Sequence, residues 1–196
     1  AEFGIIVGQG RQRVDSLADL LDDEALALPA NARLALAVLV SRLKELDQQV
    51  EAIERELALI QRTNPVAKLL SSIPGIGPIT ATALAATVPD PTMFRSGREF
   101  AAWLGLTPKQ NSTGGKDRLG RITKQGDSYL RHLLVIGARN VVRYPKARSR
   151  VGGGWVEALL DRRRPMVVAI AVANKLARII WAMMTTGEFY RPKLAA

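Results

Sequence analysis

The sequence contains no cysteine among its 196 residues. This absence excludes a disulfide scaffold, a thiolate metal site and a cysteine nucleophile, and it suits a reducing compartment, so we expect a cytoplasmic protein. The opening segment, AEFGIIVGQG, has no basic stretch followed by a long apolar one, so the sequence predicts no signal peptide. The most apolar late segment, residues 166–184, is interrupted by Asn174, Lys175 and Arg178. We therefore expect a buried helix there and no membrane partner.

Groups that hold metals or act as bases are also scarce. His132 is the only histidine, and with no partner nearby in sequence it is interpreted as an ordinary helix residue. Asp117 and Asp127 are not spaced as a catalytic carboxylate pair, and Asp127 is better placed to cap the helix that follows Gly126. The sequence therefore predicts no metal site within this chain.

The positive charge is concentrated in the second part of the chain. Residues 1–64 carry 7 Lys and Arg against 11 Asp and Glu, a net charge of −4, whereas residues 65–196 carry 21 against 7, a net charge of +14. Hydrophobic residues make up 47% of the sequence, which is enough for a globular core. The basic part is expected to bind a phosphate-rich partner, and the alternative is a merely soluble basic surface.

Residues 1–64 are expected to form a helical arm. A short helix over residues 14–28 is ended by Pro29, and a longer apolar pattern with steps of three and four follows without Gly or Pro until Pro65. This heptad pattern predicts a coiled coil that joins copies of the chain through residues 36–60, with Arg42 and Asp47 pairing across a parallel dimer. The alternative is an antiparallel hairpin within one chain. The seam consists of Leu36, Leu39, Leu43, Leu46, Val50, Ile53, Leu57 and Ile60.

Residues 65–196 are expected to form a second, compact helical domain, which makes the whole fold all-α. Apolar residues recur at helical spacing between Gly and Pro breaks, and no convincing run alternates as a strand would. The stretch RSRVGGGW, residues 148–155, is interpreted as a mobile basic turn. The expected helices cover about 66–72, 78–87, 96–104, 128–143, 154–161 and 166–186.

A first candidate phosphate contact lies in IPGIGPITATALAA, residues 73–86. Helix, Pro-Gly-Ile-Gly and helix is the layout of a helix-hairpin-helix, in which Gly75 and Gly77 allow a tight turn and exposed N–H groups hold a DNA phosphate. The alternative is an ordinary corner between helices, with Ile73, Ile76 and Ile79 in the core.

The second candidate is the basic loop PKQNSTGGKDRLGRITKQGD, residues 108–127. Gly114 and Gly115 allow N–H groups to converge on an anion, and Ser112 and Thr113 offer hydroxyls beside them. Cations would lower the cost of a serine alkoxide and stabilise a pentacoordinate phosphorus, although an incidental serine in a phosphate-binding loop is the alternative. Along the next helix, Arg131, Arg139 and Arg143 share a flank that could follow a nucleic-acid backbone, and Trp155 could stack on a base. The loop cations are Lys109, Lys116, Arg118, Arg121 and Lys124.

The segment FRSGREFAAWLGLTPKQNSTGGKDRLGRITKQGDSYLRHLLVIGAR closely resembles the C-terminal domain of the insertion-sequence one-ten family of transposases, particularly its eleven-eleven subgroup. The resemblance covers nearly the whole chain and includes the AEFGI start, IPGIGPITATALAA, RRRPMVVAIAVANKLARIIWAM and GEFYRP. Members of the family are bridge-RNA-guided DNA recombinases.

The resemblance implies that Ser112, in the small-residue loop after the Gly-Leu-Thr-Pro turn, is the nucleophile, with Thr113 as the one-residue alternative. The family's full-length enzymes also have an N-terminal RuvC-like domain with four metal-binding acids, which has no counterpart in this sequence. Mg²⁺ and the base are therefore expected on that missing domain, and the guide RNA is expected to bind the full-length enzyme. The runner-up function is a non-catalytic, dimerising helix-hairpin-helix module that binds nucleic acid.

Overall fold

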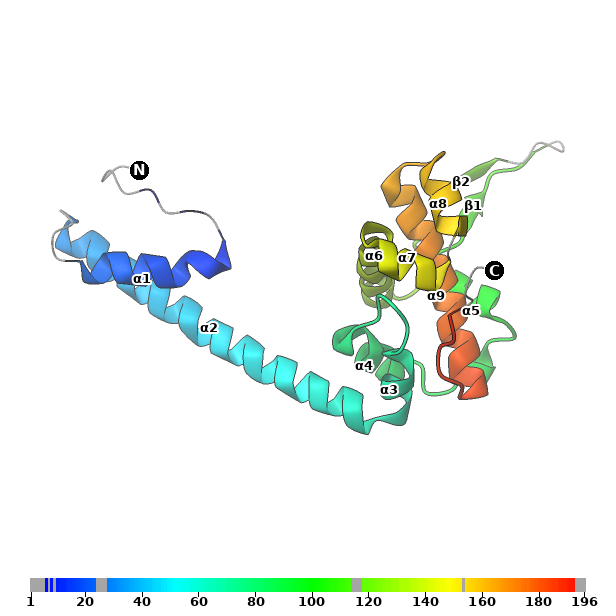
Figure 1. Cartoon of the computed structure of the whole chain (residues 1–196), viewed down its shortest axis with the longest axis horizontal. Helices are drawn as coiled ribbons and strands as arrows, with labels where there is room; N and C mark the ends of the chain where they lie inside the picture. The colour runs from blue at the N-terminus through cyan, green and yellow to red at the C-terminus, as the bar shows by residue number, and fades with distance from the viewer. Residues whose placement is uncertain are drawn as a thin grey trace. The chain divides into compact units, whose positions relative to one another are not determined.

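A computed structural model of the chain describes residues 6, 8, 10–23, 28–113, 118–152 and 154–192. The chain divides into two compact units, residues 1–56 and residues 57–196. Figure 1 shows the elements of both units.

The first unit is a helical hairpin. A short 3₁₀ turn (η1, Arg11–Arg13) leads into α1 (Val14–Asp22), and α2 (Ala30–Thr63) begins after Pro29 and continues into the second unit. Polar contacts tie α1 to α2 in antiparallel order: Arg11 pairs with Asp47 at 2.6 Å, and Arg33 donates to the Leu21 carbonyl. Each exposed ion pair contributes at most about 1 kcal/mol, so the contacts fix direction more than stability.

The predicted heptad seam lies along an exposed face of α2. Leu39 is 59% exposed and Ile53 is 60% exposed, whereas Val40, on the neighbouring face, is buried. Within the chain Arg42 pairs with Glu45 one turn further along the helix, and Asp47 pairs with Arg11. The pairing of Arg42 with Asp47 across a dimer stays a prediction. Six of the eight seam residues are therefore exposed in this chain, Leu36 and Leu57 are half-buried, and the coiled coil stays a prediction.

The second unit is built around its last helix. The helix α9 (Pro165–Thr186) packs against α6 (Ser128–Arg143) and α5 (Gly97–Trp103), and its buried face runs from Val168 to Met183. By length and composition α9 could cross a membrane, and no other helix in the described ranges could. The remaining elements are α3 (Pro65–Leu70), α4 (Pro78–Thr87), η2 (Pro91–Met93), β1 (Pro108–Gln110), β2 (Leu119–Ile122), α7 (Pro145–Val151) and α8 (Gly154–Leu160).

Most helices of the second unit begin at a capping side chain or at a proline. The side chains of Asn64, Ser96 and Asp127 each accept a hydrogen bond from a backbone N–H in the first turn of α3, α5 and α6. Proline occupies the first position of α3, α4, α7 and α9, where its missing N–H costs nothing. The expectation of a mostly helical fold is therefore confirmed.

The expectation that the fold is entirely helical is wrong at one place. Strands β1 and β2 pair antiparallel, with Pro108 opposite Ile122 and Gln110 opposite Leu119 and an irregular register between them. Both strands are mostly exposed, so they bury no alternating apolar face, which is the signal that a sequence pattern detects. Another correction concerns Ile79, which is 43% exposed although it was expected in the core with Ile73 and Ile76.

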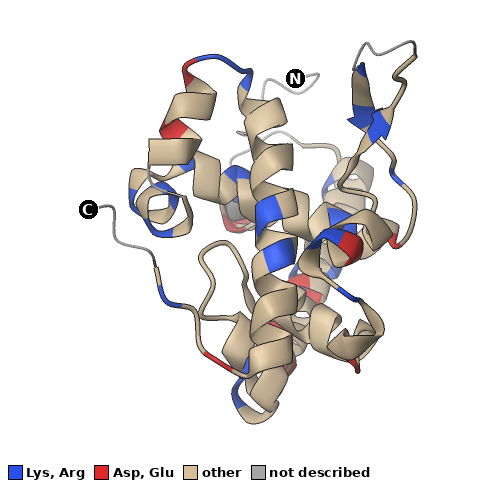
Figure 2. Ribbon diagram, turned by 90° about the vertical axis from the view of Figure 1, so that its right-hand side faces the viewer, with Lys and Arg blue, Asp and Glu red and all other residues tan. Residues whose placement is uncertain are grey.

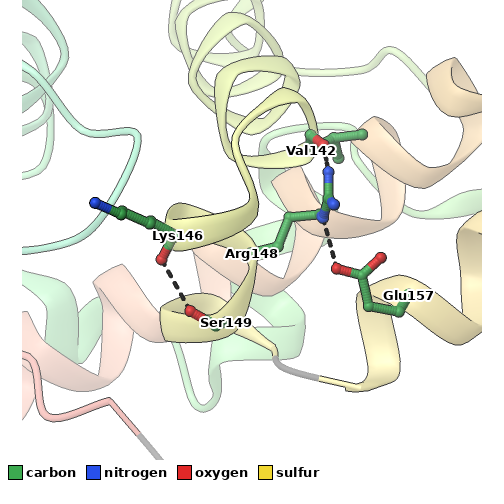
Figure 3. A network of polar contacts seen from close by, with 5 residues as sticks. All are labelled: Val142, Lys146, Arg148, Ser149 and Glu157. Atoms are coloured by element: carbon green, nitrogen blue, oxygen red, sulfur yellow. Dashed lines mark hydrogen bonds and ion pairs between the residues drawn. The ribbon is translucent and has the colours of Figure 1, made fainter.

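The stretch predicted as a mobile basic turn, residues 148–155, is partly helical. Its first four residues belong to α7, and Arg148 holds α7 in place, as Figure 3 shows. The Arg148 Nη1 donates to the Val142 carbonyl at 2.7 Å, and its Nε pairs with the Glu157 carboxylate of α8 at the same distance. One side chain therefore joins the end of α6 to α7 and α8.

The segment after α9 folds back over the unit. The backbone N–H of Tyr190 donates to the Ser72 hydroxyl at 3.2 Å, and the Tyr190 hydroxyl donates to the Arg150 carbonyl at 2.5 Å. Burial raises the pKa of the Tyr190 phenol, and the nearby Arg150 charge opposes that shift. The segment thus links the turn after α3 to α7.

Candidate nucleic-acid interface

The base of the β1–β2 hairpin is fastened to the end of α5 by two glycines in the left-handed region. Gly105 has a φ of +69°, and a Cβ there would lie 2.1 Å from the Gln125 carbonyl oxygen. Gly126 has a φ of +78°, and a Cβ there would lie 1.8 Å from the Trp103 oxygen. Only glycine allows both backbones to approach so closely, so the hairpin starts from a fixed base.

Arg131 strengthens this base. Its Nη1 donates to the Leu104 carbonyl at 3.1 Å and to the Gln125 carbonyl at 3.0 Å, joining α6 to both ends of the hairpin. The sequence placed Arg131 and Arg139 together as phosphate contacts. The structure places both on α6, but in different environments. Arg139 is exposed, whereas Arg131 is half-buried and has a structural role.

Ser112 lies in the loop that follows β1. The backbone N–H of Arg118 donates to its Oγ at 3.2 Å, and the Asn111 N–H donates to the Arg118 carbonyl at 2.8 Å, so the two sides of the loop meet at the serine. An N–H that points at the hydroxyl oxygen favours a negative charge on that oxygen. Ser112 is half-buried and the neighbouring Thr113 is exposed. The predicted phosphate contacts Gly114, Gly115 and Lys116 lie outside the described residues.

The other predicted loop cations share the hairpin. Lys109 and Arg121 lie on its strands, Arg118 lies just before β2 and Lys124 lies after it, and all four are exposed. Figure 2 shows the Lys and Arg residues of the hairpin in blue. The hairpin therefore carries a group of solvent-exposed cations on the element that holds Ser112.

A groove that the sequence did not indicate runs beside the hairpin. It has a volume of about 1680 Å³ and lies between the hairpin base, α9, α8 and the start of α5. Its floor includes Trp155, Met166 and Val167, which are 40%, 51% and 54% exposed. The cations that line it are Arg98, Arg121, Lys124, Lys175 and Arg178, and no Asp or Glu is among the described residues of its lining.

The three polar residues that interrupt α9 all face this groove. Asn174 donates to the Leu106 carbonyl at 3.2 Å, which joins α9 to the chain just before the hairpin. The Lys175 ammonium lies 4.7 Å from the centre of the Trp155 ring, within the range of a cation–π contact. The structure thus supports a role for this polar stripe beyond solvation, because it lines the groove beside the hairpin.

The Pro-Gly-Ile-Gly turn is packed against α6. Gly75 has a φ of +89°, and a Cβ there would lie 2.7 Å from the Gly137 carbonyl oxygen; a Cβ on Gly137 would lie 2.1 Å from the Gly75 oxygen. Gly77 is exposed at the start of α4, with nothing within 4 Å of its Cβ position. The contact with Gly137 gives Gly75 a packing role, whereas Gly77 has space for a ligand.

Within the described ranges, no three His, Asp or Glu side chains are grouped closely enough to hold a metal ion. His132 is exposed on α6. The residues that the structure describes therefore do not fit a catalytic Mg²⁺ ion.

The structure thus defines a mostly helical domain in which Ser112 lies on a hairpin with exposed cations, beside a groove whose described lining contains cations and no Asp or Glu. Residues 67–151 match the family described as the transposase IS116/IS110/IS902 family. Across 97% of its length the chain is 45% identical to "Putative transposase y4pF/y4sB" of Sinorhizobium fredii, covering 49% of that protein. It is 44% identical to "Probable family 20 transposase" of Pseudomonas aeruginosa, covering 57%, and 36% identical to "Transposase for insertion sequence element IS1111A" of Coxiella burnetii, covering 52%.

The chain is therefore similar to transposases of the IS116/IS110/IS902 family over most of its length, which agrees with the family expected from the sequence. It spans about half the length of the curated relatives that it matches. The eleven-eleven subgroup and the guide RNA stay predictions.

Proposed function

We propose that this chain is the DNA-binding, serine-bearing part of a cytoplasmic transposase that cleaves and exchanges DNA strands. The observation that carries the proposal is the position of Ser112: it accepts the Arg118 N–H on a cationic hairpin whose base is locked by Gly105 and Gly126. A hydroxyl that a backbone hydrogen bond holds beside exposed cations is positioned to meet a phosphate.

In the proposed reaction, the Ser112 Oγ attacks the phosphorus of a DNA phosphodiester and loses its proton to a base on another domain. The phosphorus–oxygen bond to the leaving strand breaks, and that strand departs as a protonated hydroxyl. The DNA is then held as a phosphoserine ester until the 3′ hydroxyl of the exchanged strand displaces Ser112, so no nucleotide is hydrolysed. The Arg118 N–H and the cations of the hairpin stabilise the negative charge that develops.

In this proposal the general base and the metal ion are supplied by another domain. A RuvC-like domain with acids that bind Mg²⁺, together with a guide RNA, would complete the enzyme, because the described residues of this chain offer no metal-binding cluster. The chain alone is therefore expected to bind DNA without cleaving it.

The test uses the chain completed with such a domain, Mg²⁺ and guide RNA. Ser112→Ala should abolish covalent protein–DNA adducts while it leaves DNA affinity within a few-fold, because one hydroxyl adds little to ground-state binding. Thr113→Ala is the matched control, since Thr113 is the neighbouring hydroxyl and should be much milder. A phosphodiester mapped to Thr113 by mass spectrometry, or adducts that survive Ser112→Ala, would show that the nucleophile is assigned wrongly.

The runner-up, a binding module without catalysis, is favoured by the same basic groove. Both functions require an affinity for DNA whose logarithm falls with the logarithm of salt concentration, by about 0.9 per neutralised phosphate. They separate on strand-nicked DNA, where only a nucleophilic serine traps a covalent adduct.

We also propose that copies of the chain associate through residues 36–60. The exposed apolar seam of α2, with Leu43 at 44% and Val50 at 40% exposure, supports this assembly, because a parallel partner would remove these side chains from water.

A further inference from the structure

We propose that the groove between the hairpin and α9 binds an unpaired nucleic-acid strand, with Trp155 as a platform on which a base stacks. This inference rests on the proposed function, since it takes a nucleic acid as the partner, and it adds which form of nucleic acid the groove accepts. The groove lies beside the hairpin of Ser112, so a strand held there would be close to the proposed reaction.

The charge of the groove selects an anion. Its five cations come from separate segments, with Arg98 on α5, Arg121 and Lys124 on and after β2, and Lys175 and Arg178 on α9. No carboxylate of the described lining opposes them. A ligand that repeats its negative charge along its length can neutralise several of these cations, whereas a single anion cannot.

The floor of the groove selects a ligand with exposed apolar faces. Trp155, Met166 and Val167 are large, exposed and adjacent to the cations. A duplex stacks its bases inside and turns phosphates and sugars outward, so it would leave these side chains poorly covered. An unpaired strand can place bases on them while its phosphates reach the cations, as is usual for single-strand binding.

The length of the groove fits several nucleotides. Its α9 wall extends from Met166 to Ala182, which is about 24 Å at the rise of an α-helix. Phosphates recur about every 3.4 Å along a stacked strand and farther apart along an extended one. The α9 wall is therefore long enough to contact more than one nucleotide of a bound strand.

A protein partner fits the same surface less well. The cores of protein–protein interfaces are depleted in lysine, yet Lys124 and Lys175 both line this groove. Lys175 lies over the Trp155 ring, so an incoming apolar side chain would have to pack beside a charge that a phosphate would instead neutralise. Residues 1–64 of a second copy, with their net charge of −4, are the strongest protein alternative, and the experiment below tests for it.

The experiment measures fluorescence anisotropy of labelled oligothymidine, alone and annealed to oligoadenosine, with the full chain. We expect the single strand to bind at least as tightly as the duplex in the same salt. Trp155→Leu should weaken single-strand binding about tenfold, which corresponds to the loss of one stacked base, and should leave duplex binding within twofold. Trp103→Leu is the matched control, because Trp103 is also partly exposed (36%) but does not line the groove.

A second pair of variants keeps the test valid if a tryptophan variant fails to fold. Val167→Glu adds a negative charge on the groove floor, and Ile136→Glu adds the same charge at an exposed apolar position of α6 outside the groove. The first should weaken single-strand binding more than the second, with circular dichroism confirming that both remain folded.

The possible results separate the two proposals. If both strands bind but the groove variants behave like their controls, the inference is wrong and the proposed function survives. If no nucleic acid binds at low salt, both fail. If the groove variants lower the molar mass measured by light scattering and leave strand affinity unchanged, the groove holds a second copy of the chain, and the inference is overturned.

Discussion

Replacing Gly137 with alanine tests the packing of the Pro-Gly-Ile-Gly turn against α6. In an exposed helix interior, alanine is favoured over glycine by about 1 kcal/mol. At Gly137 the added Cβ would lie 2.1 Å from the Gly75 oxygen, where 3.4–4 Å is ordinary contact. The turn and α6 would have to separate by about 1 Å, and overpacking of this kind costs about 1–3 kcal/mol or more. We expect a net loss of about 2 kcal/mol in the free energy of unfolding, opposite in sign to the helix propensity.

The assay is urea denaturation followed by circular dichroism. With a slope of about 2 kcal/mol per molar urea, the midpoint should fall by about 1 M. Gly154→Ala is the matched control, because Gly154 also lies in a helix but nothing lies within 4 Å of its Cβ position, so its midpoint should stay or rise. A Gly137→Ala midpoint at or above that of the wild type would refute the packing role of this contact.

Three further predictions test other parts of the structure. Arg131→Met should speed amide hydrogen exchange in residues 105–110 and 118–126, because the hairpin base loses two hydrogen bonds, whereas Arg139→Met should not. Leu43→Asp with Val50→Asp should convert any dimer seen by light scattering into a helical monomer, since each buried charge is costly; a wild type that is monomeric at micromolar concentrations would instead favour the intramolecular hairpin. The Tyr190 phenol should titrate above its ordinary value by ultraviolet difference spectroscopy. Because its folded pKa is raised, the stability it contributes is present below pH ~10 and is lost as the pH rises through the folded pKa, a loss that Tyr190→Phe should remove.

Local signals explain which parts of the fold could be predicted. Helices that begin at Pro65, Pro78 and Pro165 were expected within one residue, because proline and the caps before it act through neighbouring backbone. The helix α7 was missed, since its residues PKARSRV carry cations where a periodic apolar face would be expected. The hairpin was missed because its strands are stabilised by backbone hydrogen bonds and bury no alternating face.

In the candidate site, too, residues close together in sequence could be predicted and residues brought together by folding could not. The residues of the basic loop were identified from composition, because hydroxyls, glycines and cations lie together in sequence. The groove could not be predicted, since residues that line it, such as Arg98, Lys124 and Lys175, lie far apart along the chain and come together only in the folded domain. Gly75 was expected to face a phosphate, but its neighbour Gly137 is sixty-two positions away, beyond the reach of any local pattern.

The helix α6 contacts both loops that the sequence singled out. Arg131 holds the hairpin base, and Gly137 touches the turn of Gly75, six residues or about 9 Å further along the same axis. Because a helix barely stretches, this separation is constant, and neither loop can shift along the axis without moving the other. Under the proposed function, a DNA backbone that touched both loops would be selected by the spacing of its phosphates rather than by its base sequence.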